Sequence, residues 1–216
     1  DGTHQPECRV KWREGRDEKE ASQQAAREVL MRLPADFRPD DVVLRVEDKA
    51  GRRRLERDRV WIVDPLDGTR EFSEPPRDDW AVHVALWERG ELVAGAVALP
   101  GLDQTFHTGA PPVVPPASGG RPRIVVSRTR PPAFVQALAG EIAAGLVPMG
   151  AAGAKVMAVV RDLSDAYVHA GGQYEWDSAA PVAVARAAGL FTSRVDGSPL
   201  VYNQDDVLLP DLVVCR

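Results

Sequence analysis

Short runs of apolar residues, separated by polar turns, mark the first half of the chain. The runs at 80–87 and 92–100 flank the turn sequence ERGE, and together they predict an antiparallel β-hairpin. Shorter runs predict strands over 41–46 and 60–64, the second of them buried. Residues 15–33 instead place apolar side chains at helical spacing ahead of a proline, which predicts a helix before the first strand.

The second half of the chain alternates strands with helices. A segment dense in proline and glycine at 109–123 predicts a boundary between two sub-domains, 1–110 and 111–216. The strands predicted after it cover 123–127, 166–170 and 211–215, and the predicted helices cover 132–145, 153–163 and 178–189. Strands that alternate with helices in this way predict a layered α/β architecture.

Composition narrows the classes of protein that fit this pattern. The 216 residues are 44% hydrophobic, which is enough for one sizeable core or two closely packed sub-domains. The net charge is −5, and the arginine-rich segment 51–59 is predicted to be a solvated loop, so nucleic acid is not expected as a partner. No apolar stretch approaches the roughly 20 residues of a membrane helix, so no membrane partner is expected.

The two cysteines indicate a reducing compartment. Cys8 and Cys215 stand near opposite ends of the chain and form no CxxC pair, so neither a thiolate zinc site nor a disulfide framework is expected. A cytoplasmic location fits best. The chain begins at Asp1 rather than Met, which suggests that an N-terminal segment is missing.

Two carboxylates, Asp64 and Asp67, stand three residues apart in the sequence WIVDPLDGTREF, where the buried strand ends. Asp-Gly alone most often marks only a turn. Here, however, Asp64 ends a buried strand, where an unpaired charge is costly. Gly68 and Thr69 then offer backbone N–H groups that suit a phosphate oxygen. The pattern therefore predicts a site as well as a turn.

A second acidic site is predicted in QYEWDSAAP, where Asp177 precedes an apolar helix. Taken alone, Asp177 is better explained as a helix N-cap. If Asp64, Asp67, Asp177 and Glu47 converge, each pair at about 5 Å would repel by roughly 3 kcal/mol at an effective dielectric near 20. Such a cluster needs a compensating cation. All-oxygen ligands select Mg²⁺ first, with Mn²⁺ or Ca²⁺ as competitors.

These motifs resemble those of a known family. WIVDPLDGTREF is similar to the D-P-x-D-G-T signature of the inositol monophosphatase superfamily of lithium-sensitive, Mg²⁺-dependent phosphatases, and WDSAAP to its W-D-x-A-A-P signature. SRTRPP, GAAGAK and GGQYEWDSAAP further resemble its CysQ-type branch of 3′(2′),5′-bisphosphate nucleotidases. The resemblance covers about 40–216 and implies an α-β-α-β-α sandwich.

The resemblance also implies roles for individual residues. The metal ligands implied are Asp64, Asp67, Asp177 and the Leu66 carbonyl, with Glu47 as the candidate for a further acidic ligand. They would bind two or three Mg²⁺ ions, and Li⁺ would inhibit the enzyme. The catalytic residues implied are Glu47, Asp67 and Thr69, with Thr69 orienting the attacking water. The substrate-binding positions implied are Gly68, Thr69, Ser127, Arg128, Lys155 and Asp177. A simpler interpretation of Arg128 is surface solvation.

The sequence departs from the family pattern before the first signature. The family usually places an acidic pair 18 to 20 positions ahead of Asp64. That window reads LRVEDKA here, and Val46 stands at the first acidic position. Valine is no ligand, so either Glu47 or Asp48 substitutes for it, or one metal site is impaired. Ala151 also stands where a serine is common.

We therefore expect a Mg²⁺-dependent phosphatase for a small phosphomonoester. The resemblance implies removal of the 3′-phosphate of 3′-phosphoadenosine 5′-phosphate. Inositol 1-phosphate and fructose 1,6-bisphosphate remain as substrates of the same chemistry. The alternative is a degenerate member of the family that binds metal and phosphate but turns over weakly or not at all. Val46, in place of an acidic ligand, supports this alternative. The sequence leaves open whether the protein forms a homodimer.

Overall fold

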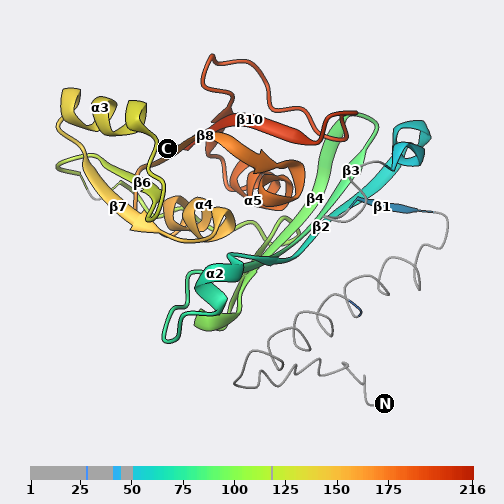
Figure 1. The fold of residues 1–216 in the computed structure, drawn as a ribbon, viewed down its shortest axis with the longest axis horizontal. Coiled ribbons are helices and arrows are strands. Elements are labelled where there is room, and N and C mark those ends of the chain that lie inside the picture. Colours follow the sequence, from blue (N-terminus) through green and yellow to red (C-terminus); the bar gives the residue numbers. More distant parts are fainter. Residues whose placement is uncertain (1–27, 29–40, 45–50, 118) are drawn as a thin grey trace.

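Two five-stranded sheets form the frame of the molecule (Figure 1). The computed structural model describes residue 28 and residues 41–44, 51–117 and 119–216. The first sheet has the order β1-β2-β3-β4-β5. Its strands are β1 (Val42–Leu44), β2 (Arg59–Asp67), β3 (Ala81–Glu88), β4 (Glu91–Leu99) and β5 (Gln104–His107). Only β1 and β2 run parallel, and the other neighbours are antiparallel.

The second sheet is mixed and has the order β7-β6-β8-β10-β9. Its strands are β6 (Arg123–Ser127), β7 (Gly145–Met149), β8 (Ala166–Tyr174), β9 (Phe191–Ser193) and β10 (Leu208–Cys215). β6 runs parallel to β7 and β8, whereas β10 is antiparallel to β8 and β9. The carboxyl ends of β6 and β7 therefore lie at the same edge of the sheet.

Two helices, α4 (Ala152–Val160) and α5 (Glu175–Ala187), lie between the sheets, and α3 (Ala133–Glu141) covers the outer face of the second sheet (Figure 1). The alternation along β6 explains this layering. Val125 faces the main core, whereas its neighbours on the strand face α3. All nine residues of α4 are buried, which is expected of a helix enclosed by other elements on all sides.

The described layers agree with the predicted sandwich. The hairpin at 80–87 and 92–100 is confirmed as β3 and β4. The predicted first helix, 15–33, lies outside the described residues except for residue 28, which is helical. The sub-domain boundary at 110/111 stays a prediction, and the two sheets lie on either side of it.

Several predicted elements differ in length. Strand 60–64 extends to Asp67, strand 166–170 extends to Tyr174, and the helix predicted from 178 begins at Glu175. The prediction missed β5, β7 and β9. β7 was missed because it is short, directly follows a helix and contains Pro148, which a sheet tolerates at an edge.

The prediction of a loop with solvated arginines at 51–59 was wrong for Arg54 and for Arg59, which begins β2 and pairs with Asp41 and Glu88. Residues 52–56 form the 3₁₀ helix η2 (Arg52–Glu56), and Arg54 is buried within it. Its guanidinium donates to the Asn203 side chain at 2.9 Å and to the Gln204 carbonyl. These partners compensate its burial. In the described part of the chain, no helix is both long and apolar enough to cross a bilayer.

Candidate active site

Three carboxylates meet where β2 ends and α5 begins. Asp64 pairs with His83 across the sheet, but the register shifts before Asp67, which pairs with Ala81. This irregularity re-aims the second carboxylate, because residues three apart on a regular strand point to opposite faces. Asp177 joins them from the first turn of α5. Ligand oxygens of all three lie within 4.8 Å of one another.

The cluster is electrostatically unfavourable by itself. Asp64 is 5% exposed, and its Oδ1 accepts a bond from the Leu66 backbone N–H at 3.0 Å. Burial, together with the negative charges of Asp67 and Asp177, raises the pKa of Asp64 well above its usual value. A hard divalent cation would remove this penalty. The donor set therefore fits the cation that the sequence predicted.

Asp67 has contacts on two sides. Its Oδ2 accepts the backbone N–H of Gly153, in the first turn of α4, at 2.7 Å and lies 3.3 Å from Nε2 of His83. Nδ1 of this histidine lies 3.1 Å from the Trp176 carbonyl. Burial lowers the pKa of His83. Because a carbonyl oxygen only accepts, a neutral His83 carries its proton on Nδ1 and donates it to Trp176, so its Nε2 has no proton to donate to Asp67.

The turn after Asp67 presents backbone groups to the same place. Gly68 has the left-handed φ of 84° and precedes the short helix α2 (Thr69–Phe72). A side chain there would be strained, and its Cβ would lie 2.8 Å from that of Ala151. The Thr69 hydroxyl donates to the Leu66 carbonyl at 3.4 Å. The predicted phosphate-holding turn is therefore packed tightly against the start of α4.

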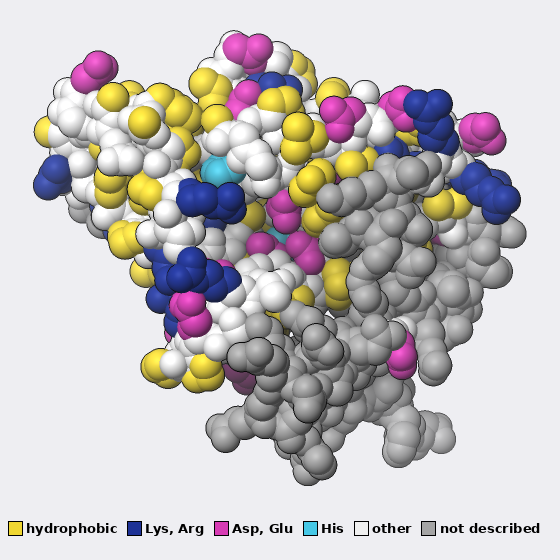
Figure 2. All heavy atoms as spheres, viewed as in Figure 1, with side chains coloured by type: hydrophobic (Ala, Val, Ile, Leu, Met, Phe, Trp, Pro, Cys, Tyr) yellow, Lys and Arg dark blue, Asp and Glu magenta, His cyan; other side chains and the backbone are white. Residues whose placement is uncertain are grey.

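These residues open onto a cavity of about 670 Å³. The predicted residues that line it are Asp67, Gly68, Thr69, Ser127, Lys155 and Asp177. In Figure 2, acidic side chains lie in a hollow that Lys and Arg side chains border on one side. A cavity with both charges suits a ligand that carries phosphate and also binds a cation.

Comparison with known proteins identifies the family. The inositol monophosphatase family model matches residues 10–111 and 121–213. The chain belongs to the inositol monophosphatase family. A 3′-phosphoadenosine 5′-phosphate phosphatase of Mycobacterium bovis is 51% identical over 208 residues, which cover 91% of this chain and 77% of the relative.

More distant relatives carry the same family fold. The 3′(2′),5′-bisphosphate nucleotidase CysQ of Escherichia coli is 31% identical over 196 residues, which cover 86% of this chain and 79% of the relative. A crystal structure of CysQ from Bacteroides thetaiotaomicron superposes with a TM-score of 0.73 at 24% identity, over 91% of this chain and 82% of that one. The layered α/β sandwich of the inositol monophosphatase family is thus confirmed.

Two substrate positions carried over from the family differ in their surroundings. Lys155 is 4% exposed, donates from Nζ to the Gly150 carbonyl and lies 5.3 Å from the centre of the Tyr167 ring. Burial lowers the pKa of Lys155, and the nearby carboxylates, Asp67 first, oppose that effect. Arg128 is not among the described residues that line the cavity. The Leu66 carbonyl, predicted as a ligand, follows Asp64 in the same turn, and Glu47 lies outside the described residues.

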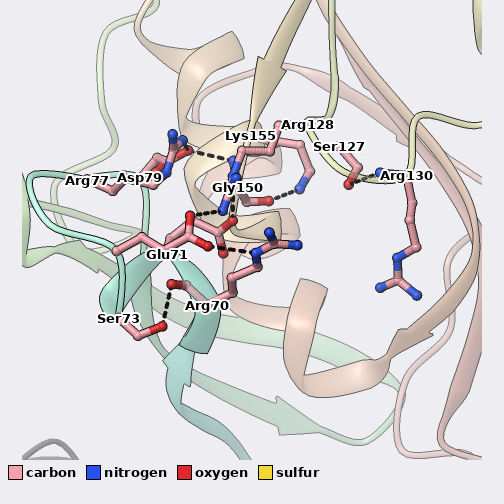
Figure 3. Close-up of polar contacts among 11 residues, drawn as sticks. Arg70, Glu71, Ser73, Arg77, Asp79, Ser127, Arg128, Arg130, Gly150 and Lys155 are labelled. Atoms are coloured by element: carbon pink, nitrogen blue, oxygen red, sulfur yellow. Dashed lines mark hydrogen bonds and ion pairs between the residues drawn. The ribbon is translucent and has the colours of Figure 1, made fainter. Parts of the chain in front are cut away.

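Sequence reasoning missed several residues that line the cavity. Arg130, His169 and Gln173 belong to this group. The Arg130 guanidinium has no hydrogen bond or ion pair to a described residue, whereas its backbone N–H donates to the Ser127 hydroxyl at 3.2 Å (Figure 3). Burial lowers the pKa of His169, and the charges of Lys155 and Arg130 lower it further. The signals that could have found them were Arg130 in SRTRPP and Gln173 in GGQYEWDSAAP, two motifs already noted for the family resemblance.

Proposed function

We propose that this protein is a Mg²⁺-dependent phosphatase that removes the 3′-phosphate of 3′-phosphoadenosine 5′-phosphate and releases AMP. The observation that carries the proposal is the 51% identity over 91% of the chain to a relative named for this phosphatase activity. The mixed charge of the cavity supports it, because a bisphosphate needs both a cation-binding carboxylate cluster and protein cations.

We assign Mg²⁺ to the carboxylates Asp64, Asp67 and Asp177, with the Leu66 carbonyl and Glu47 as further ligands. When bound, such cations neutralise phosphate charge and lower the pKa of water. The assignment agrees with the raised pKa of Asp64, which marks a group short of positive charge. The family resemblance further predicts that Li⁺ inhibits the enzyme and that two or three Mg²⁺ ions bind.

The protein's own groups would bind and orient the substrate. The backbone N–H groups of Gly68 and Thr69 would hold the 3′-phosphate, and the Thr69 hydroxyl would orient the attacking water. This water would attack phosphorus in line, the bond from phosphorus to the ribose 3′-oxygen would break, and the leaving oxygen would gain the proton that the water loses, so that AMP and inorganic phosphate are released. Arg130 and Lys155 line the same cavity as this turn, and we assign the 5′-phosphate to them.

A phosphate-release panel tests this function. The purified protein is assayed with 3′-phosphoadenosine 5′-phosphate, inositol 1-phosphate and fructose 1,6-bisphosphate, each with Mg²⁺ and with EDTA. We expect the nucleotide to give the highest kcat/KM and EDTA to abolish release. A higher kcat/KM for either sugar phosphate would contradict the substrate assignment. No release from any of the three would favour the degenerate, binding-only member of the family.

The Arg130→Gln variant tests the second phosphate. We expect its KM for 3′-phosphoadenosine 5′-phosphate to rise at least tenfold, while its KM for 3′-AMP, which lacks the 5′-phosphate, changes less than twofold. An equal change for both substrates would place Arg130 outside the 5′-phosphate site. The cytoplasmic location and the homodimer stay predictions, and sedimentation of the purified protein tests the second.

A further inference from the structure

The guanidinium of Arg128 lies between two carboxylates of the segment that follows the phosphate-holding turn. Its Nε donates to Glu71 at 2.9 Å (Figure 3), and its Nη2 donates to Glu74 at 2.6 Å. The backbone N–H of the same arginine donates to the Met149 carbonyl at 3.0 Å. Arg128 therefore links the first sheet's active-site turn to the ends of two strands of the second sheet.

The Glu71 side chain fills a space that exists only because residue 150 is glycine. Glu71 is 7% exposed, and a Cβ built on Gly150 would overlap its side chain. On the other side, the Gly150 N–H donates to the Asp79 carboxylate at 2.6 Å, and the Ala151 N–H donates to the Asp79 carbonyl at 3.0 Å. Arg77 forms an ion pair with the same carboxylate. The 150–151 turn is thus fixed from both sides.

This turn touches both parts of the site that contact phosphate and metal in the proposed function. A Cβ on Gly68 would lie 2.8 Å from the Ala151 Cβ and 3.3 Å from a Glu71 carboxylate oxygen. Directly after the turn, α4 begins, and its Gly153 N–H binds Asp67. A shift of Glu71 would therefore be transmitted to Gly68 on one side and to Asp67 on the other.

We propose that Arg128 and Glu71 form a clamp that positions the Gly68–Thr69 turn and Asp67, so that Arg128 is a positioning residue and not a substrate ligand. The proposal rests on the phosphatase function above. Glu71 and Glu74 already accept hydrogen bonds from the Arg128 guanidinium, and the Arg128 side chain is only 20% exposed. A substrate phosphate that took the Nε–H of Arg128 would have to break the pair with buried Glu71, which would leave that carboxylate without its partner.

The test compares Arg128→Gln with a matched variant on the same strand. Arg123 lies at the start of β6, whereas Arg128 follows its end, and Arg123 forms ion pairs with Asp162 and Asp165 at 2.8 and 2.9 Å. Arg123 does not belong to the described lining of the cavity. Losing either arginine removes an ion pair with two carboxylates. Only the loss at Arg128 is expected to change the active site.

Three measurements separate a clamp from a substrate ligand. For Arg128→Gln, we expect kcat to fall at least tenfold by the same factor with 3′-phosphoadenosine 5′-phosphate and with 3′-AMP. We expect calorimetry with Mg²⁺ alone to give an affinity several-fold weaker than wild type. Arg123→Gln should lower the melting temperature and leave both quantities within twofold. Arg128→Lys should restore part of kcat, because lysine keeps the positive charge but lacks the planar guanidinium that donates to both glutamates.

Each alternative result contradicts the clamp. A rise in KM confined to the bisphosphate would make Arg128 a ligand of the second phosphate. If Arg128→Gln keeps both the kcat and the Mg²⁺ affinity of wild type, Arg128 does not position the Gly68–Thr69 turn or Asp67. If Arg128→Gln does not fold, Glu71→Gln keeps the side-chain volume and tests the same pair. If wild type releases no phosphate, the proposed function fails, and the Mg²⁺ affinities still decide whether the clamp acts on Asp67.

Discussion

Removing one charge from the carboxylate cluster should stabilise the metal-free protein while abolishing its activity. Asp64→Asn is the sharpest perturbation, because Asp64 is buried and its pKa is raised by burial and by Asp67 and Asp177. The amide oxygen of asparagine can still accept the bond from the Leu66 N–H. The shape of the turn should therefore survive, and only the charge is lost.

The structure sets the size of the effect. Ligand oxygens lie within 4.8 Å of one another, so each repulsive pair is worth about 3.5 kcal/mol at an effective dielectric near 20. At pH 7 the substitution cannot relieve the full repulsion of Asp64 with its two neighbours, because Asp64 in the wild type can bind a proton instead. Protonating a carboxyl with an ordinary pKa of 3.8 costs about 4 kcal/mol at that pH, which is an upper limit on the relief. We expect about 2 kcal/mol.

The assay is thermal unfolding in EDTA, followed by the same measurement in Mg²⁺. For a chain of this size, about 2 kcal/mol raises the melting temperature by about 4 to 8 °C. Mg²⁺ should stabilise wild type more than Asp64→Asn, because a cation stabilises only the state it binds. Phosphate release by the variant should fall below a tenth of wild type, which corresponds to more than about 1.4 kcal/mol of barrier.

A charge-removing control has the opposite expected sign. Asp165 accepts bonds from Arg123, and those bonds lower the pKa of Asp165. Asp165→Asn should therefore destabilise the protein in EDTA. If Asp64→Asn melts at or below the wild-type temperature in EDTA, the three carboxylates do not repel one another and the electrostatic argument for a cation site is refuted.

Three further predictions concern the same site. Gly150→Ala should destabilise the protein by about 1–3 kcal/mol and lower kcat, because the new Cβ overlaps Glu71, and chemical denaturation with a rate assay would measure both. Val46→Glu should raise the initial rate at low Mg²⁺ at least tenfold, about 1.4 kcal/mol of barrier, unless Glu47→Gln shows that Glu47 already supplies the carboxylate. Li⁺ should inhibit at millimolar or lower concentration, and an activity indifferent to Li⁺ would indicate a rebuilt metal site.

The sequence was most informative where the chemistry is local. Asp64, Asp67 and Gly68 lie in one turn, so a few backbone angles fix their relation, and the pattern alone predicted both carboxylates and the turn. For Asp177 the residues alone favoured a helix N-cap, and the family motifs then implied a ligand role; the structure places Asp177 beside the other two carboxylates from another element. The hairpin formed by β3 and β4 was predictable for the same local reason.

Partners far apart in sequence escaped prediction. Arg128 donates to Glu71, which lies 57 positions earlier in the chain. Arg54 donates to Asn203, which lies 149 positions later. The residues next to Arg54 and Arg128 in the sequence give no sign of which distant side chain each arginine will meet. This is why the sequence could not distinguish Arg128, which pairs with glutamates, from Arg130, which lines the cavity.

The prediction of Asp177 as a helix N-cap was wrong in position, because Tyr174 is the N-cap of α5 and Asp177 is the third residue of the helix, but a capping bond and a ligand role are compatible. Its Oδ2 accepts the Tyr174 N–H at 2.7 Å, a bond typical of a helix start, and its carboxylate also lies in the acidic cluster. Asp64 and Asp67 repeat the arrangement, each accepting one backbone N–H. A carboxylate has about four acceptor positions, so one such bond fixes its orientation and leaves capacity for a cation. The backbone bonds therefore preorganise the ligands before any cation binds, and the repulsion among them is what a cation relieves.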